Sequence, residues 1–182
     1  MTIDLQLFHL INNLAGRSPL GDHAIVFFGS YLAYILIVLF IGLIAFARIS
    51  TIHKLYILAE AAVAALVARF GVTELIRVFI HRPRPFLVEH PVHQLLSDPA
   101  WSFPSGHATF FFALATTVYL YNRRWGVFFY VATTLMTLGR VAAGVHYPTD
   151  ILAGALIGLL AAQMAYILGR RINIRTPKPL DS

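Results

Sequence analysis

The segment from Ile25 to Phe46 contains no charged residue over 22 consecutive positions. As an α-helix it would be about 33 Å long, which is enough to cross a hydrocarbon core of ~30 Å. The whole chain has the same character, since 58% of its residues are hydrophobic and only 12% are charged. Soluble domains are closer to half apolar and a quarter charged. The sequence therefore predicts an integral membrane protein, folded as one bundle rather than as several domains.

Further apolar segments follow the first one, separated by polar or proline-containing connections. We expect membrane spans over residues 25–46, 56–80, 104–121, 125–143 and 148–168. Residues 3–15 alternate apolar and polar side chains with helical spacing but are too short and too polar to span, which is typical of a helix in the membrane interface. The predicted fold class is all-α, a polytopic transmembrane helix bundle of about five spanning helices with an N-terminal interfacial amphipathic helix.

We expect a single membrane-embedded domain, with the interfacial helix in residues 1–20, the transmembrane core in 22–170 and a cytoplasmic tail in 171–182. The N-terminus lacks the charged and cleavable segments of a signal peptide, so the first span is expected to act as the insertion signal. The absence of cysteine excludes disulfides and thiolate chemistry. The net charge of +6 comes from Lys and Arg clustered between apolar runs, which indicates membrane topology and anionic lipid contact rather than nucleic-acid binding.

The alternation of the predicted spans determines which polar segments share a membrane face. If the first span starts on face A, then residues 81–103, the start of the third span and residues 140–150 all lie on face A. Face B carries eight of the fourteen Lys and Arg residues, namely Arg48, Lys54, Arg123, Arg124, Arg170, Arg171, Arg175 and Lys178. Basic residues concentrate on the cytoplasmic side of membrane proteins. Face A is therefore predicted to be extracytoplasmic.

Three polar clusters converge on face A. They are Arg77, Arg82 and Arg84; Ser105, Gly106 and His107; and Arg140, His146 and Asp150. The planar fork of arginine donors matches phosphate oxygens. A helix start preceded by proline and bearing glycine offers free backbone N–H groups to the same kind of anion. Together the clusters predict a binding site for a phosphate dianion.

The two histidines suit the chemistry of phosphate transfer. Asp150 follows His146 by four residues, and Pro148 opens a helix between them. A carboxylate placed there can accept one imidazole N–H and leave the other nitrogen free to attack. His107 can then protonate the leaving oxygen.

Other polar residues have simpler interpretations. Any single interfacial Arg or His could snorkel or cap a helix, and only the set on one face argues for a site. We expect Arg69 and Glu74 to pair inside the bundle rather than to bind substrate. His81, His90 and His93 are too loosely spaced for a metal site beside so many arginines, so we expect polar loop residues and no metal or cofactor. The run Phe110 to Phe112 is expected to pack or to contact lipid.

The clusters resemble the signature of the type 2 phosphatidic acid phosphatase superfamily, K-x6-R-P, P-S-G-H and S-R-x5-H-x3-D. The corresponding segments are RVFIHRPRP from Arg77 to Pro85, PSGH from Pro104 to His107, and GRVAAGVHYPTD from Gly139 to Asp150. The resemblance implies metal-independent hydrolysis through a phosphohistidine, with His146 as nucleophile, Asp150 orienting it and His107 as acid. It also implies that phosphate is held by Arg77, Arg84, Arg140 and the backbone of Ser105 and Gly106. Arg77 replaces the family lysine and Gly139 replaces the family serine.

The small size and the segment HRPRPF resemble the bacterial undecaprenyl diphosphate phosphatases of this superfamily. That resemblance implies a phosphorylated lipid as substrate and a multi-pass protein of the bacterial inner membrane whose site faces the periplasm or cell exterior. Phosphatidylglycerophosphate, lipid A or phosphatidate are alternative substrates, and transfer of phosphate to a second lipid is an alternative reaction. An anion or lipid transporter is the alternative of another class, but we find no internal repeat in the sequence. The sequence does not determine the oligomeric state.

Overall fold

The structure is a computed structural model that describes residues 2–171, and within them every regular element is helical. This confirms the predicted all-α class. The elements are α1 (Ile3–Asn12), α2 (Pro19–Val26), η1 (Phe27–Tyr31), α3 (Leu32–Phe46), α4 (Thr51–Leu66), η2 (Val67–Val72), α5 (Thr73–Phe79), α6 (Pro85–Val88), α7 (Gly106–Tyr121), α8 (Arg123–Ala142) and α9 (Pro148–Arg171). The labels η1 and η2 denote π-helical turns inside longer helices. All but the first residue of the predicted tail lies outside the described residues.

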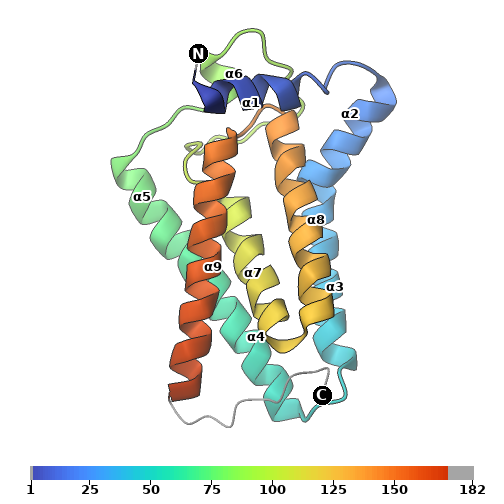
Figure 1. The fold of residues 1–182 in the computed structure, drawn as a ribbon, viewed down its shortest axis with the longest axis vertical. Helices are drawn as coiled ribbons and strands as arrows, with labels where there is room; N and C mark the ends of the chain where they lie inside the picture. Colours follow the sequence, from blue (N-terminus) through green and yellow to red (C-terminus); the bar gives the residue numbers. More distant parts are fainter. Residues whose placement is uncertain (1, 172–182) are drawn as a thin grey trace.

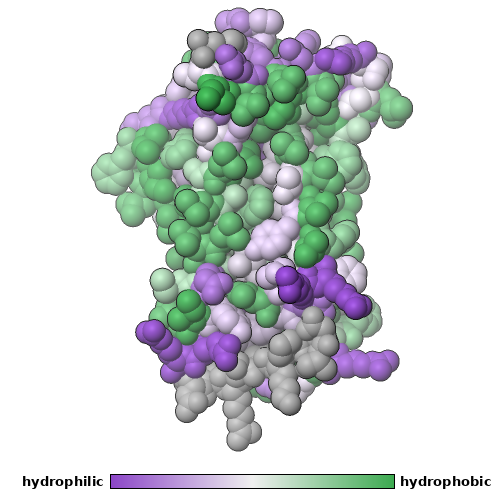
Figure 2. All heavy atoms as spheres, in the orientation of Figure 1, coloured by the Kyte–Doolittle hydropathy of each residue, from purple (hydrophilic) through white to green (hydrophobic). Residues whose placement is uncertain are grey.

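Four helices of the described chain are long and apolar enough to cross a membrane: Pro19–Phe46, Thr51–Phe79, Arg123–Ala142 and Pro148–Arg171. The first of them begins earlier than predicted, because Ser18 caps its N-terminus and Pro19 occupies the first turn. Figure 2 shows the corresponding surface, an apolar belt between two polar ends. This arrangement fits a multi-pass membrane protein.

The remaining predicted span is α7, which has only 16 residues and is therefore about 24 Å long. It lies at the centre of the bundle against α4, α8 and α9, and its first turn starts deeper than the outer ends of α8 and α9 (Figure 1). Most of its residues are buried. Since its neighbours shield it from lipid, α7 does not need the length of a spanning helix. Its short length places its N-terminus beneath the outer surface.

Close backbone packing joins α7 to α9. A Cβ atom added at Gly154 would lie 2.6 Å from the carbonyl oxygen of Ser105, and one added at Gly158 would collide with the carbonyl oxygen of Thr109. Small residues of this kind let membrane helices approach closely. The two glycines therefore determine how near the start of α7 lies to the start of α9.

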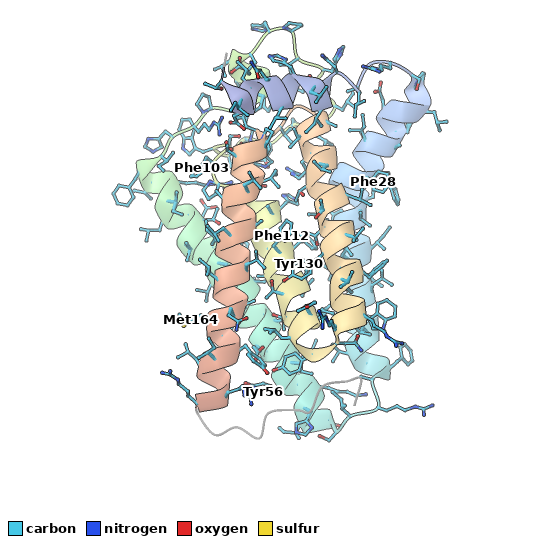
Figure 3. The ribbon with its side chains drawn as sticks, in the orientation of Figure 1. Phe28, Tyr56, Phe103, Phe112, Tyr130 and Met164 are labelled. Atoms are coloured by element: carbon cyan, nitrogen blue, oxygen red, sulfur yellow. The ribbon has the colours of Figure 1, made fainter. Side chains whose placement is uncertain are left out.

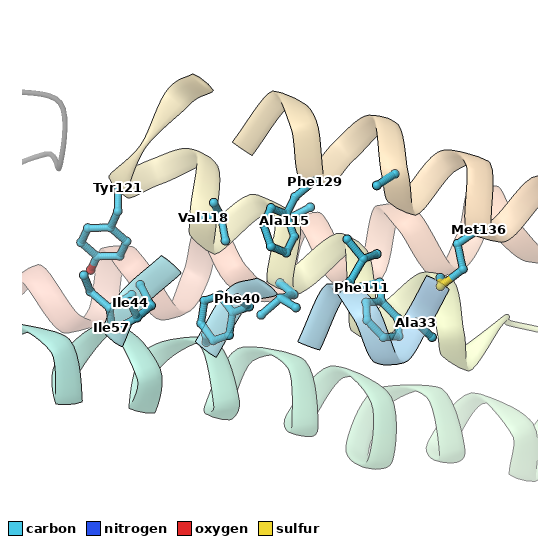
Figure 4. Close-up of a cluster of buried hydrophobic side chains, with 14 residues drawn as sticks. Ala33, Phe40, Ile44, Ile57, Phe111, Ala115, Val118, Tyr121, Phe129 and Met136 are labelled. Atoms are coloured by element: carbon cyan, nitrogen blue, oxygen red, sulfur yellow. The ribbon is translucent and has the colours of Figure 1, made fainter. Parts of the chain in front are cut away.

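The apolar core lies between α3, α4, α7 and α8. Phe40, Phe111, Phe129 and Met136 are among its buried side chains (Figure 4). Along the α7–α8 contact, the rings of Phe112 and Tyr130 lie 6.2 Å apart (Figure 3). These side chains hold the helices that carry the polar clusters in fixed positions.

The N-terminal amphipathic helix α1 lies across the outer end of the bundle (Figure 1). Its residues Ile3 and Leu10 are exposed, whereas Phe8 is fully buried against the ring of Tyr147, 5.4 Å away. Asn12 is also buried, and its amide donates to the carbonyls of His93 and Ala142. The predicted helix is thus present, and its inner face packs on protein over the turn that precedes α9.

Candidate active site

The three predicted polar clusters lie at the outer end of the bundle, where the loop after α5, the start of α7 and the turn between α8 and α9 meet. Phe103, which is labelled in Figure 3, lies near this end of the bundle. The backbone N–H of Ser105 donates to the carbonyl of Asp150 at 3.0 Å, so the first turns of α7 and α9 are tied together directly. The counting of spans in the sequence therefore placed these segments on the correct common face of the bundle.

His146 lies in the turn before α9 and is only 1% exposed. Its Nδ1 atom is 3.5 Å from Oδ2 of Asp150, and its Nε2 atom is 3.3 Å from Nη1 of Arg84. Burial lowers the pKa of His146 to about 4, and the charges of Arg140 and Arg84 act in the same direction. The imidazole is therefore neutral near pH 7, with Nε2 directed toward the arginine.

Asp150 is completely buried and held by several donors. The Ser102 hydroxyl and the Tyr147 N–H both donate to Oδ2, the latter at 2.8 Å, and Arg82 Nη1 donates to Oδ1 at 2.7 Å. Arg82 belonged to the predicted arginine cluster without an assigned role, and Ser102 was not among the predicted site residues. Neither residue had a signal of its own, because only the folded loop brings them to the carboxylate.

Arg82 also joins the site to the N-terminal helix. Its Nη2 donates to Asp4 at 2.6 Å, and its guanidinium stacks 3.8 Å above the Tyr147 ring. Asp4 in turn accepts from the backbone N–H of Thr149 at 3.0 Å. Helix α1 therefore fixes the first turn of α9 from outside.

Two predicted phosphate-binding arginines share one carboxylate. Nη2 of Arg84 lies 2.8 Å from Oδ1 of Asp98, and Nη2 of Arg140 lies 3.3 Å from its Oδ2. Although burial alone would raise the pKa of Asp98, the Arg84 and Arg140 charges hold it below its usual value. Asp98 is thus an anion between the two cations. Asp98 was not among the predicted site residues, since a lone Asp in the connection of residues 81–103 has no distinctive spacing.

Arg84 is also anchored from behind. Its Nε donates to the carbonyl of Ala100 and its Nη1 to that of Val145, both at 2.7 Å. These bonds orient a buried guanidinium whose remaining donors face Asp98 and His146. The role of Arg84 in phosphate binding stays a prediction.

Arg77 occupies a different position from the other two arginines. It is 5% exposed, its Nη1 donates to Glu74 at 3.0 Å, and its Nη2 donates to the carbonyl of Pro104 at 3.0 Å. Glu74 also forms the predicted ion pair with Arg69. The structure therefore places Arg77 behind the segment that leads into α7, and its direct contact with phosphate stays a prediction.

The PSGH segment forms the start of α7, as its sequence predicts. Ser105 is the N-cap, and its hydroxyl accepts from the N–H of Ala108 at 3.4 Å. His107 lies in the first turn and lines a cavity of about 190 Å³ with Gly106, Arg69 and Phe70. Unpaired N–H groups at such a helix start can bind an anion.

The departure at Gly139 has a steric reason. A Cβ atom at this position would lie 2.7 Å from the backbone nitrogen of Gly29, because η1 packs directly on α8 there. Next to it, Nη1 of Arg140 donates to the carbonyl of Gly29 at 3.1 Å. In this chain the first membrane span orients Arg140 at the point where the family signature has a serine.

Two of the loop histidines contact neighbouring residues of the outer end of the bundle. Within residues 2–171, no group of three His, Cys, Asp or Glu side chains is arranged to hold a metal ion. The His81 ring lies 5.0 Å from that of Trp101, and the backbone N–H of His93 donates to Asn12. Both contacts are those of polar loop residues.

Comparison with known proteins agrees with this geometry. Residues 54–174 match the PAP2 superfamily. The chain is 32% identical over 161 residues to undecaprenyl-diphosphatase BcrC of Bacillus subtilis (strain 168), covering 87% of this chain and 80% of that protein. It is 26% identical over 165 residues to the bacitracin transport permease protein BcrC of Bacillus licheniformis, covering 90% of this chain and 79% of that one.

The fold is also similar to a solved structure, the crystal structure of Aquifex aeolicus LpxE. The TM-score is 0.74 at 29% sequence identity, covering 92% of this chain and 96% of that one. The family match extends over more than half of the chain and includes all three polar clusters. The protein therefore belongs to the PAP2 superfamily and is a multi-pass membrane lipid phosphatase.

Proposed function

We propose that the protein hydrolyses a lipid diphosphate at the extracytoplasmic membrane face through a phosphohistidine, converting undecaprenyl diphosphate to undecaprenyl phosphate. The observation that carries the proposal is the placement of His146, whose Nδ1 faces buried Asp150 while Nε2 lies 3.3 Å from Arg84. A neutral imidazole held this way has one nitrogen free for attack. The name of the Bacillus subtilis relative supports the choice of lipid.

In the first step, Nε2 of His146 attacks the terminal phosphorus. The bond between that phosphorus and the bridging oxygen breaks, and the electron pair stays on the oxygen, which takes a proton from His107. Arg84, Arg140 and the N–H groups at the start of α7 stabilise the charge on the transferring group. Phosphoryl transfer depends mainly on such positioning and charge stabilisation.

In the second step, water attacks the phosphohistidine while His107 accepts its proton. The N–P bond breaks, phosphate leaves and His146 returns to its neutral form. The arginines supply the positive charge that a metal supplies in other phosphatases, so the proposed reaction uses no metal or cofactor.

The proposed orientation rests on the distribution of basic residues. The end of α3 and the starts of α4 and α8 lie at the end of the bundle opposite the site (Figure 1), and Arg48, Lys54 and Arg123 are in or next to these segments. With that end in the cytoplasm, the site faces the periplasm or cell exterior of a bacterial inner membrane. A membrane-impermeant thiol reagent added to intact spheroplasts should therefore label a cysteine introduced at Leu87, an exposed residue of α6.

Purified protein should release phosphate from undecaprenyl diphosphate in the presence of a chelator. His146→Ala should abolish turnover, and Asn13→Ala, an exposed change in the turn after α1, is the control. A panel with phosphatidylglycerophosphate, lipid A and phosphatidate, each with and without an acceptor lipid, separates the alternative substrates and phosphotransfer. Undiminished turnover by the His146→Ala protein would exclude the mechanism.

A transport function is the second candidate, because the Bacillus licheniformis relative carries the name of a permease. It predicts movement of a labelled lipid or anion across proteoliposomes. Flux that persists in His146→Ala liposomes without phosphate release would favour it.

A further inference from the structure

Arg69 is a charged residue in the middle of a membrane span that the proposed reaction does not use. It lies in the π-helical turn η2, which interrupts the helix Thr51–Phe79. Turns of this kind are frequent at functional sites, and charge at membrane depth is costly unless it has a function or a partner. Its partner is Glu74, which it shares with Arg77.

The guanidinium of Arg69 lies against the start of α7. A Cβ atom at Gly106 would overlap its Nε, Cδ and Cζ atoms, so the glycine makes room for the arginine. Arg69 and His107 line the same cavity of about 190 Å³, whose other walls are Ile37 and three phenylalanines. The cavity therefore combines one cation and one proton donor with apolar side chains.

Arg69 retains hydrogen-bonding capacity. Within residues 2–171, only its Nη1 makes a hydrogen bond, to Glu74, and its guanidinium is stacked 4.9 Å from the centre of the Phe70 ring. Arginine has five N–H donors. The Nε and Nη2 groups thus remain available to an anion in the cavity.

The geometry points to Arg69 as a substrate-binding residue for the tail-side phosphate of a lipid diphosphate. This inference rests on the proposed function, in which His107 protonates the leaving oxygen. In a diphosphate that oxygen belongs to the second phosphate, so this group must lie on the His107 side of the reacting phosphorus. Arg69 is the cation that lines the cavity there.

The consequence is selectivity for diphosphates over monophosphates. When the P–O bond to the bridging oxygen breaks, negative charge develops on the tail-side phosphate, and a fixed guanidinium stabilises it. With a monophosphate ester, the leaving oxygen is bonded to carbon and offers Arg69 no second phosphate. Ile37 and Phe70, both lipid-exposed, would border the first part of the lipid tail.

The test compares Arg69→Gln with wild type in detergent, using farnesyl diphosphate and dilauroyl phosphatidate as substrates. The kcat/KM for the diphosphate should fall by about 100- to 1000-fold, as for loss of one preorganised donor to a developing anion. Orthovanadate probes only the His146 region. Turnover of phosphatidate and the inhibition constant of orthovanadate should each change by less than about twofold, well under the tenfold change that 1.4 kcal/mol produces. Equal losses on both substrates, or an unchanged diphosphate rate, would overturn the inference.

Glu74→Gln is the matched control, because it removes the same ion pair but keeps the cation. It should preserve the preference for the diphosphate, whereas a purely structural ion pair would make both variants lose that preference alike. If wild type hydrolyses neither substrate, the proposed function fails. If wild type hydrolyses only the diphosphate, vanadate inhibition serves as the reference for Arg69→Gln.

Discussion

The carboxylate of Asp98 lies 2.8 Å from the guanidinium of Arg84, and its second oxygen reaches Arg140. An acidic side chain thus occupies the donors that are predicted to bind a phosphate. Substrate must share those donors with Asp98 or displace it. The loop that carries Asp98 therefore competes with anions for the site.

Asp98→Asn should strengthen inhibition by orthovanadate, since removal of a like charge favours an anion beside the arginines. We expect the inhibition constant to fall by about tenfold, which corresponds to ~1.4 kcal/mol. Asp22→Asn, in the first turn of α2, should leave it unchanged. Weaker inhibition in Asp98→Asn would show instead that the carboxylate orients the arginines.

Arg82→Ala should destabilise the protein, because it leaves the fully buried Asp150 without its ion-pair partner. Breaking a buried pair costs about 3–5 kcal/mol, and the partial exposure of Arg82 reduces this to roughly 2–3 kcal/mol. The apparent melting temperature in detergent should fall by about 5–10 °C. Arg17→Ala removes an exposed contact to the Asn13 carbonyl and should not change the melting temperature.

The protonation of His146 gives a pH prediction. Its folded-state pKa of about 4 lies below the usual ~6.5, so the unfolded chain binds more protons between these values. The stability from this group is present above pH ~6.5 and is lost as the pH falls through about 4. The His146 ring signal in NMR spectra of histidine-labelled protein should stay constant from pH 8 to 5. Asp150→Asn should lower the midpoint further, because the Asp150 carboxylate raises this pKa.

Gly158→Ala should separate α7 from α9. The added methyl group would collide with the backbone of Thr109, and overpacking costs about 1–3 kcal/mol. The shift would move His107 relative to His146, so kcat should fall by at least about tenfold. Gly42→Ala is the control, since nothing lies within 4 Å of its added Cβ. Equal melting temperatures and rates for the two variants would contradict the proposed packing.

Sequence patterns predicted the helical class and the grouping of Arg84, Ser105, Arg140 and His146 at one end of the bundle. These succeeded because hydrophobic runs and their alternation across a membrane depend on local sequence. The predicted span 104–121 is present as α7, although it is short, because its neighbours shield it from lipid.

The contacts of Asp98, Ser102 and Arg82 could not be predicted. Each lies in the polar connection between α5 and α7, whose path depends on tertiary contacts such as the Arg84 bonds to Ala100 and Val145. Spacing along the chain carries no information about such a path. The π-helical turn that contains Arg69 could not be predicted from the sequence either, because its residues fit an ordinary α-helix pattern.

The contact between Gly29 and Gly139 has an evolutionary consequence. A Cβ atom at position 139 would lie 2.7 Å from the backbone nitrogen of Gly29, and one at position 29 would lie 3.1 Å from the backbone of Gly139, while η1 packs on α8 at this distance. A mutation at one of them should therefore be retained only together with a displacement of the first span, so the two positions should change together among relatives. A relative with serine at position 139 should hold the following arginine with that hydroxyl rather than with the carbonyl at position 29.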